Sequence, residues 1–196
     1  MSEDLPRESD DRDSRLDRAG EDWRGLFEDL AAGRLSALED LYDAAAPRLY
    51  GLALWRTGSA EDAADVVQDA FLRVVEQGAG LVKIRNPRAW LLTVAHRAAV
   101  DVTRRRRRRP SEPIEDHPYL TDDVDEGERL LDATHVSVML AALPAAMREV
   151  IYLKHFLGCT FAEIGAIVGA PTFTAASRYR NGVNRLRRLM EDRHEN

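Results

Sequence analysis

Residues 160–190, TFAEIGAIVGAPTFTAASRYRNGVNRLRRLM, predict two helices separated by a tight turn. Thr160 and Glu163 have the spacing of a capping box, which marks a helix start. Gly169 can adopt the left-handed conformation that ends this first helix, and the proline two residues later prevents its continuation. A longer, basic helix is predicted from about Thr174 onward. Short helix, turn and long basic helix is the order of a helix-turn-helix.

The second predicted helix has two faces when successive residues are placed about 100° apart. One face is apolar or small and is expected to pack on the domain: Ala175, Tyr179, Gly182, Leu186 and Leu189. The other is polar or basic: Thr174, Ser177, Arg178, Asn181, Asn184, Arg185 and Arg188. Such side chains can hydrogen-bond base edges and phosphates, so this helix is a candidate for reading DNA. A solvated basic helix that closes a bundle is the simpler alternative.

The chain has 196 residues, which suits one or two small domains, and a formal net charge of −6. Acidic residues concentrate in the first thirty positions and in residues 112–132, whereas residues 104–109 and the last predicted helix are strongly basic. This distribution is typical of basic working surfaces separated by acidic connectors.

Several classes of function lack their motifs in this sequence. Cys159 is the only cysteine, so an internal disulfide and a cysteine-cluster zinc site are ruled out. The GxxxxGK[ST], HExxH and GxSxG patterns are absent, so we expect no enzyme activity, no metal ligands and no cofactor. The charged N-terminus is unlike a signal peptide, and no apolar run approaches the ~20 residues that span a membrane. A cytoplasmic protein without membrane insertion is expected.

Residues 23–109 are predicted to form a helical bundle, because no segment alternates with the period of a strand. Ser36 and Glu39 have capping-box spacing before a long apolar helix, which Pro47 is expected to kink or divide. Ser59 is the predicted N-cap of the next helix. The side chains expected to face inward from that helix are Val66, Val67, Ala70, Phe71 and Val74.

After a glycine-containing loop, Asn86 as N-cap and Pro87 as first residue predict a helix that runs into the arginines. Six consecutive arginines, residues 104–109, exceed what a helix dipole favours, and a phosphate backbone is their natural counterion. Basic and aromatic side chains suited to single-stranded bases also lie in this segment: Lys83, Arg85, Trp90 and Arg97. A lone tryptophan is more often part of a core.

The remaining segments complete an all-α fold class with two small helical domains. Residues 1–22 are predicted to be a disordered acidic tail, and residues 110–132 a flexible acidic linker with prolines. Residues 133–192 are predicted to form the second domain, which contains the helix-turn-helix.

Three segments carry a family resemblance, in this order along the chain: AEDAADVVQDAFLRVV (60–75), NPRAWLLTVAHRAAVDVTRRRR (86–107) and LPAAMREVIYLKHFLGCTFAEIGAIVGAPTFTAASRYRNGVNRLRRL (143–189). Together they resemble the bacterial RNA polymerase sigma factors of the extracytoplasmic-function type, in the sigma-70 family. The resemblance covers roughly residues 35–109 and 140–189.

The resemblance implies a role for each segment. The first is similar to region 2.2, which binds the β′ clamp helices of polymerase, and it implies core contacts at Asp62, Asp65, Gln68 and Asp69. The second is similar to regions 2.3 and 2.4, which melt and read the −10 element, and it implies DNA contacts at Lys83, Arg85, Asn86, Arg97, Arg104 and Arg105. The third is similar to region 4, which docks on the β flap and reads the −35 element through Thr174, Ser177, Arg178, Asn181, Arg185 and Arg188.

The sequence departs from the family pattern at two positions. Arg97 stands where an asparagine is common, which leaves the −10 base preference open. Phe173 stands where a glycine is frequent before the recognition helix. Its ring can cap that helix as an apolar plug or contact DNA, and the sequence does not choose between the two.

The resemblance implies a dissociable specificity subunit of polymerase with no catalysis of its own. Its expected partners are the polymerase core and promoter DNA, and an anti-sigma factor is left open. One alternative is a free-standing helix-turn-helix regulator that binds duplex DNA without polymerase. Another is a helical adaptor whose basic surfaces bind acidic partners. Substitution of Asp65 and Gln68 discriminates the polymerase subunit from the free-standing regulator, because it should abolish polymerase association in the first case and have no effect in the second.

Overall fold

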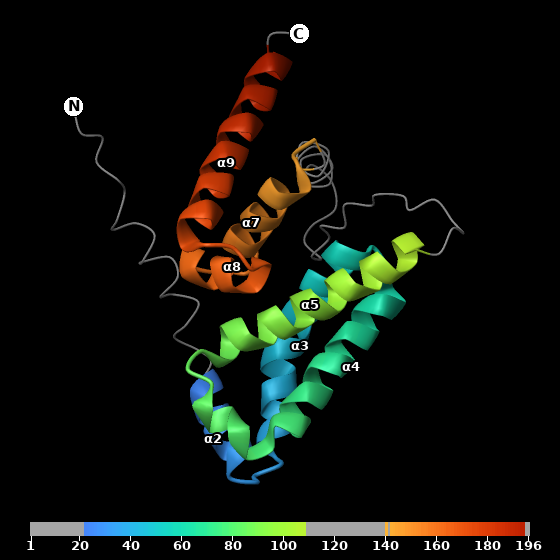
Figure 1. The fold of residues 1–196 in the computed structure, drawn as a ribbon, viewed down its shortest axis with the longest axis vertical. Helices are drawn as coiled ribbons and strands as arrows, with labels where there is room; N and C mark the ends of the chain where they lie inside the picture. The colour runs from blue at the N-terminus through green and yellow to red at the C-terminus, as the bar shows by residue number, and fades with distance from the viewer. Residues whose placement is uncertain (1–21, 109–139, 141, 195–196) are drawn as a thin grey trace, which may run out of the picture.

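The computed structural model describes residues 22–108, 140 and 142–194, which form helices and turns without a strand among them (Figure 1). The N-terminal unit contains α2 (Trp23–Ala31), α3 (Ala37–Thr57), α4 (Ala60–Gln77), the 3₁₀ helix η1 (Gly78–Lys83) and α5 (Pro87–Arg108). The C-terminal unit contains α7 (Ala145–His155), α8 (Phe161–Val168) and α9 (Thr172–His194). The predicted all-α class is confirmed. Apart from Asp22, the predicted tail and linker lie outside the described residues.

The N-terminal unit is built on α3, α4 and α5, which pack against one another, while α2 closes the end beside η1. Its core side chains are almost completely buried: Leu41, Leu49 and Leu52 from α3, Val66 and Val74 from α4, and Leu91 and Leu92 from α5. All five residues predicted to face inward from α4 are buried, so that prediction is confirmed. Each fully buried side chain of this size stabilises the fold by about 1.5–3 kcal/mol.

Two of the predicted helix starts in this unit are confirmed. The Ser59 hydroxyl accepts a hydrogen bond from the Asp62 amide at 3.3 Å, and the Asn86 side-chain oxygen accepts one from the Ala89 amide at 3.0 Å. The capping box at Ser36 is wrong, because Ser36 has helical backbone angles and its side chain makes no capping bond. A tight backbone turn precedes α3 and takes the place of the cap.

Pro47 does not divide its helix, since α3 continues through it to Thr57. The proline lies on an exposed side of the helix. The glycine-containing segment predicted as a loop includes η1, whose Leu81 is buried against the bundle.

The C-terminal unit has the predicted order of short helix, turn and long helix. Gly169 adopts the left-handed conformation, with φ of 67°, and ends α8 as predicted. The long helix α9 begins at Thr172, two residues before the predicted start.

The two units pack against each other, and α8 lies on α5 (Figure 1). Val150, Leu153 and Ile164 of the C-terminal unit belong to the same buried cluster as Leu49 and Leu91 of the N-terminal unit. We call this contact between the two units the closed arrangement. No sequence pattern predicts it. Among the described helices, none combines the length and the apolar character that crossing a membrane requires.

Candidate partner and nucleic-acid surfaces

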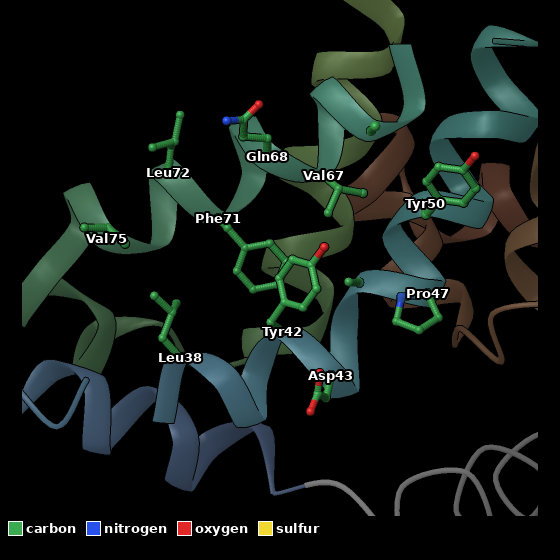
Figure 2. Close-up of a pocket in the computed structure, with 12 residues that line it drawn as sticks. Leu38, Tyr42, Asp43, Pro47, Tyr50, Val67, Gln68, Phe71, Leu72 and Val75 are labelled. Atoms are coloured by element: carbon green, nitrogen blue, oxygen red, sulfur yellow. The ribbon is translucent and has the colours of Figure 1, made fainter. Parts of the chain in front are cut away.

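A groove of about 820 Å³ lies between α3 and α4 and is lined mainly by apolar side chains (Figure 2). The rings of Tyr42 and Phe71 meet in its middle, with their centroids 4.9 Å apart. Tyr42, Leu72 and Val75 are each more than half exposed, at 51%, 54% and 57%. Large apolar side chains gathered in an exposed hollow mark a surface that binds a partner.

Three of the four residues predicted to contact polymerase are exposed on α4: Asp65, Gln68 and Asp69. Gln68 also lines the groove. Asp62 differs, because its side chain is only 19% exposed and its carboxylate forms an ion pair with Arg106 at 2.7 Å. The structure therefore brings Gln68 to the groove, leaves Asp65 and Asp69 exposed beside it on α4, and pairs Asp62 with an arginine of the run at the end of α5.

Sequence reasoning missed the apolar part of this surface. Leu72 and Val75 follow Gln68 at four and seven residues, a spacing that places all three on one side of α4. Because Leu72 and Val75 are apolar but fall outside the set predicted to face inward, this spacing could have predicted an exposed apolar surface on α4.

The basic residues predicted to contact the −10 element are exposed in the described structure: Lys83, Arg85, Arg97, Arg104 and Arg105. Arg97 and Arg104, seven residues apart, lie on the same side of α5. Trp90 packs edge-on against Phe27, with ring centroids 5.9 Å apart, and is partly buried. Trp90 therefore belongs to the core of the bundle rather than to an open stacking surface.

Asn86, the sixth residue predicted to contact the −10 element, makes two contacts within the protein. Its side-chain amide donates a hydrogen bond to Glu163 of α8 at 2.9 Å, in addition to capping α5. Arg88 lies 3.9 Å from the same carboxylate and donates to the Leu157 carbonyl. In this closed arrangement Asn86 holds the two units together.

A second carboxylate, that of Glu149 on α7, is bound in the same way by the N-terminal unit. It lies 2.7 Å from the His96 ring nitrogen of α5 and 3.5 Å from the Arg56 guanidinium of α3. Beside it, Trp55 stacks on Tyr152 with ring centroids 4.6 Å apart and an interplanar angle of 8°. Basic and aromatic side chains of one unit thus match acidic and aromatic side chains of the other.

The electrostatics of this contact favour two ionised carboxylates. Burial alone raises the pKa of Glu149, but the hydrogen bond with His96 and the charges of His96, Arg56 and Arg178 lower it below its ordinary value. Burial likewise raises the pKa of Glu163, and its bonds with Thr160 and Asn86 bring the net shift below the ordinary value.

Cys159, the single cysteine of the sequence, is buried beside this contact. Burial raises the pKa of its thiol to about 12. A protonated, buried thiol is chemically inert, which agrees with a packing role.

Two local features determine the geometry of the helix-turn-helix: a capping box at the start of α8 and a close backbone approach in the turn that follows it. The predicted capping box is complete: the Thr160 hydroxyl accepts from the Glu163 amide at 3.3 Å, and the Glu163 carboxylate accepts from the Thr160 amide at 2.8 Å. A Cβ atom at Gly165 would lie 2.6 Å from the Ala170 carbonyl oxygen. The close turn that orients α9 therefore requires glycine at this position of α8.

The predicted packing face of α9 is confirmed by burial, with Ala175 and Gly182 buried and Tyr179, Leu186 and Leu189 partly buried. Of the predicted reading face, Ser177, Asn181, Arg185 and Arg188 are exposed. Thr174 and Arg178 are partly buried, and Arg178 is close enough to Glu149 to lower its pKa. The exposed residues missed by the predicted face include Phe173, Arg180 and Arg187. The outward direction of α9 is thus rotated away from Arg178 and toward Arg180.

Comparison with known families identifies the N-terminal unit. The model of Sigma-70 region 2 matches residues 41–109. The chain is 32% identical over 165 residues to the ECF RNA polymerase sigma factor SigL of Mycobacterium tuberculosis, a match that covers 83% of this chain and 93% of that protein. It is 29% identical over 191 residues to the ECF RNA polymerase sigma factor SigK of Mycolicibacterium vanbaalenii, covering 90% of this chain and 93% of that one.

Solved structures share the fold. CnrH, determined in complex with the cytosolic domain of CnrY, matches with a TM-score of 0.61 at 22% identity, over 86% of this chain and 97% of that one. The sigma factor RpoE, determined in complex with the anti-sigma factor NepR from Bartonella quintana, matches with a TM-score of 0.59 at 24% identity, over 78% and 96% of the two chains. These likenesses show that the chain shares its overall fold with both proteins.

Proposed function

This chain belongs to the extracytoplasmic-function sigma factors of the sigma-70 family, and we propose a division of labour among its three exposed surfaces. As an RNA polymerase sigma factor it directs transcription initiation at specific promoters, with core polymerase and promoter DNA as partners. We assign residues 23–109 to core binding and the −10 element, and residues 133–192 to the −35 element.

The groove between α3 and α4 is the proposed site for core polymerase. A helix with an apolar stripe suits the hollow lined by Tyr42, Leu72 and Val75, and a basic residue beside that stripe would meet Asp65 on the adjoining side of α4. This groove is the observation that carries the proposal. A free-standing regulator needs a DNA-reading helix but has no use for an exposed apolar groove on its other unit.

The two basic surfaces are the proposed DNA contacts. On α5, Arg97 and Arg104 share one exposed side, which suits the phosphates of a separated strand. On α9, the exposed residues Ser177, Arg180 and Asn181 suit the major groove, where a recognition helix presents its N-terminal residues to base edges.

Association with core polymerase tests the assignment of the groove. We expect Leu72→Glu to weaken binding to core polymerase at least about tenfold, because a charge would enter the apolar centre of the contact. The double substitution of Asp65 and Gln68 by alanine is expected to weaken binding as well. The matched control is Leu35→Ala, since Leu35 is 74% exposed but does not line the groove.

Two outcomes would contradict the proposal. Unchanged core binding by the Leu72 variant would place the polymerase contact elsewhere. Tight, sequence-specific duplex binding by the wild-type chain alone, with no gain from polymerase, would favour the free-standing regulator.

The proposal also covers regulation and place of action. Because RpoE was determined with the anti-sigma factor NepR, we propose that an anti-sigma factor controls this chain too. A sigma factor contributes specificity rather than catalysis, so no catalytic residue is assigned. Its site of action is the bacterial cytoplasm, where RNA polymerase works.

A further inference from the structure

Phe173 is the most exposed large apolar side chain among those of the described residues, at 76%. It is the second residue of α9, directly before the residues assigned to DNA reading. The first turn of this helix is closed by backbone bonds from the Thr174 and Ala175 amides to the Pro171 carbonyl. Phe173 therefore does not serve as an apolar plug, and its ring is available to a partner.

The direction of Phe173 follows from helical geometry. At about 100° per residue, Phe173 lies opposite Gly182, which is buried against Ile151 and Met147 of α7. Ser177 and Arg180 follow Phe173 at four and seven residues, and both are exposed. Phe173 thus lies at the N-terminal end of the row of α9 side chains that faces away from the rest of the protein.

The chemistry of a phenyl ring limits what it can recognise on DNA. The ring has no donor or acceptor, so it cannot pair with base edges or neutralise phosphates. In the major groove the apolar group that differs between base pairs is the C5 methyl of thymine, which phenylalanine can contact. The N-terminal end of a recognition helix is also the part that reaches base edges.

We propose that Phe173 reads one thymine of the −35 element through contact of its ring with the C5 methyl group. The proposal rests on the proposed function, since it requires α9 to enter the major groove. It assigns a base preference to a side chain for which the sequence alone left two roles open.

Selection from a duplex library tests this assignment. Holoenzyme assembled with the wild-type chain or with Phe173→Ala would select from duplexes randomised across the upstream element. We expect wild type to prefer thymine at one position and the variant to lose that preference while it keeps the others. Leu35→Ala, which removes an equally exposed apolar side chain far from α9 in sequence, is expected to select as wild type does.

Removal of the methyl group alone gives the sharper readout. At the selected position, thymine would be replaced by deoxyuridine, which lacks only the C5 methyl. Wild type is expected to bind about fourfold more weakly, the change that burial of one methyl group produces, and Phe173→Ala is expected to be insensitive. A wild type that ignores the replacement, or a variant equally sensitive to it, would overturn the proposal. Loss of base preference at every position in Phe173→Ala would also overturn the proposal, because it would show that Phe173 supports DNA binding in general and does not read one base.

Failure of this proposal is distinct from failure of the proposed function. If no holoenzyme forms with the wild-type chain, the polymerase assignment fails. The same library and the same deoxyuridine duplex would then be presented to the chain alone. If the chain alone binds the thymine and the deoxyuridine duplexes equally well, the proposed contact of Phe173 with the methyl group is overturned.

Discussion

Glu149 shows how a single residue determines the stability of the closed arrangement. Its carboxylate comes from α7, while the His96 and Arg56 side chains that bind it come from the N-terminal unit. A buried carboxylate without such partners would carry a large desolvation cost. The contact is therefore favourable only while the carboxylate is ionised.

We expect Glu149→Gln to reduce the free energy of unfolding by about 1.5–3 kcal/mol near neutral pH, the range for a hydrogen bond to a charged group. Because the pKa of Glu149 is lowered in the folded protein, its contribution is present above the unfolded pKa of about 4.3 and is lost as pH falls through the folded pKa. The difference between wild type and variant should accordingly shrink in acid. Urea unfolding at a series of pH values measures it.

Glu191→Gln is the control for this titration, because Glu191 is exposed at the end of α9. It should leave the stability almost unchanged at every pH. A constant difference between wild type and Glu149→Gln down to strongly acidic pH would show that the lost carboxylate charge does not matter.

At the scale of the helices, the turn between α8 and α9 depends on backbone proximity. We expect Gly165→Ala to destabilise the protein by about 1–3 kcal/mol, because the new Cβ atom would collide with the Ala170 carbonyl and displace α9. Gly80→Ala is the matched control, since its Cβ atom meets only the end of the flexible Gln77 side chain. Urea unfolding followed by circular dichroism compares the two. Equal losses would mean that the turn tolerates the extra atom.

Helix starts, helix periods and the inward faces could be predicted from sequence because they depend on neighbours a few residues away. The Thr160 box and the Ser59 cap are examples of such local signals. Ser36 has the same spacing, but backbone bonds in the preceding turn set its conformation. The outward direction of α9 was only partly predicted, because the partial burial of Arg178 depends on where α7 lies.

For the molecule as a whole, the contact between the units could not be predicted. It joins His96 to Glu149 across 53 positions and Asn86 to Glu163 across 77, and neither pair has a local pattern. The contact also involves Asn86, which was expected on the −10 surface. In the closed arrangement its side-chain amide donates a hydrogen bond to Glu163 of α8. A residue with two possible partners cannot be assigned from its own segment alone.

The closed arrangement conflicts with simultaneous reading of both promoter elements. The −10 and −35 positions on the promoter are about 25 base pairs apart, which corresponds to roughly 85 Å of duplex at 3.4 Å per base pair. The 22 residues of α5 span only about 33 Å, and α8 lies against that helix. The units must therefore separate when the sigma factor engages a promoter. Residues 109–139 are long enough to permit this, since an extended chain covers about 3.3 Å per residue.

Distance measurement between fluorescent labels tests this separation. Labels would be attached at Val82→Cys and Ala162→Cys, two exposed positions close in sequence to Asn86 and Glu163, which are hydrogen-bonded between the units, while the native Cys159 stays unlabelled because its thiol is buried and protonated. We expect energy transfer to be high in the free chain and to fall strongly in the complex with polymerase and promoter. A pair within one unit, Ala32→Cys and Gln77→Cys, should not change. Unchanged transfer between the units in an active complex would mean that the DNA bends to the closed protein, because the distance along a straight duplex cannot otherwise be covered.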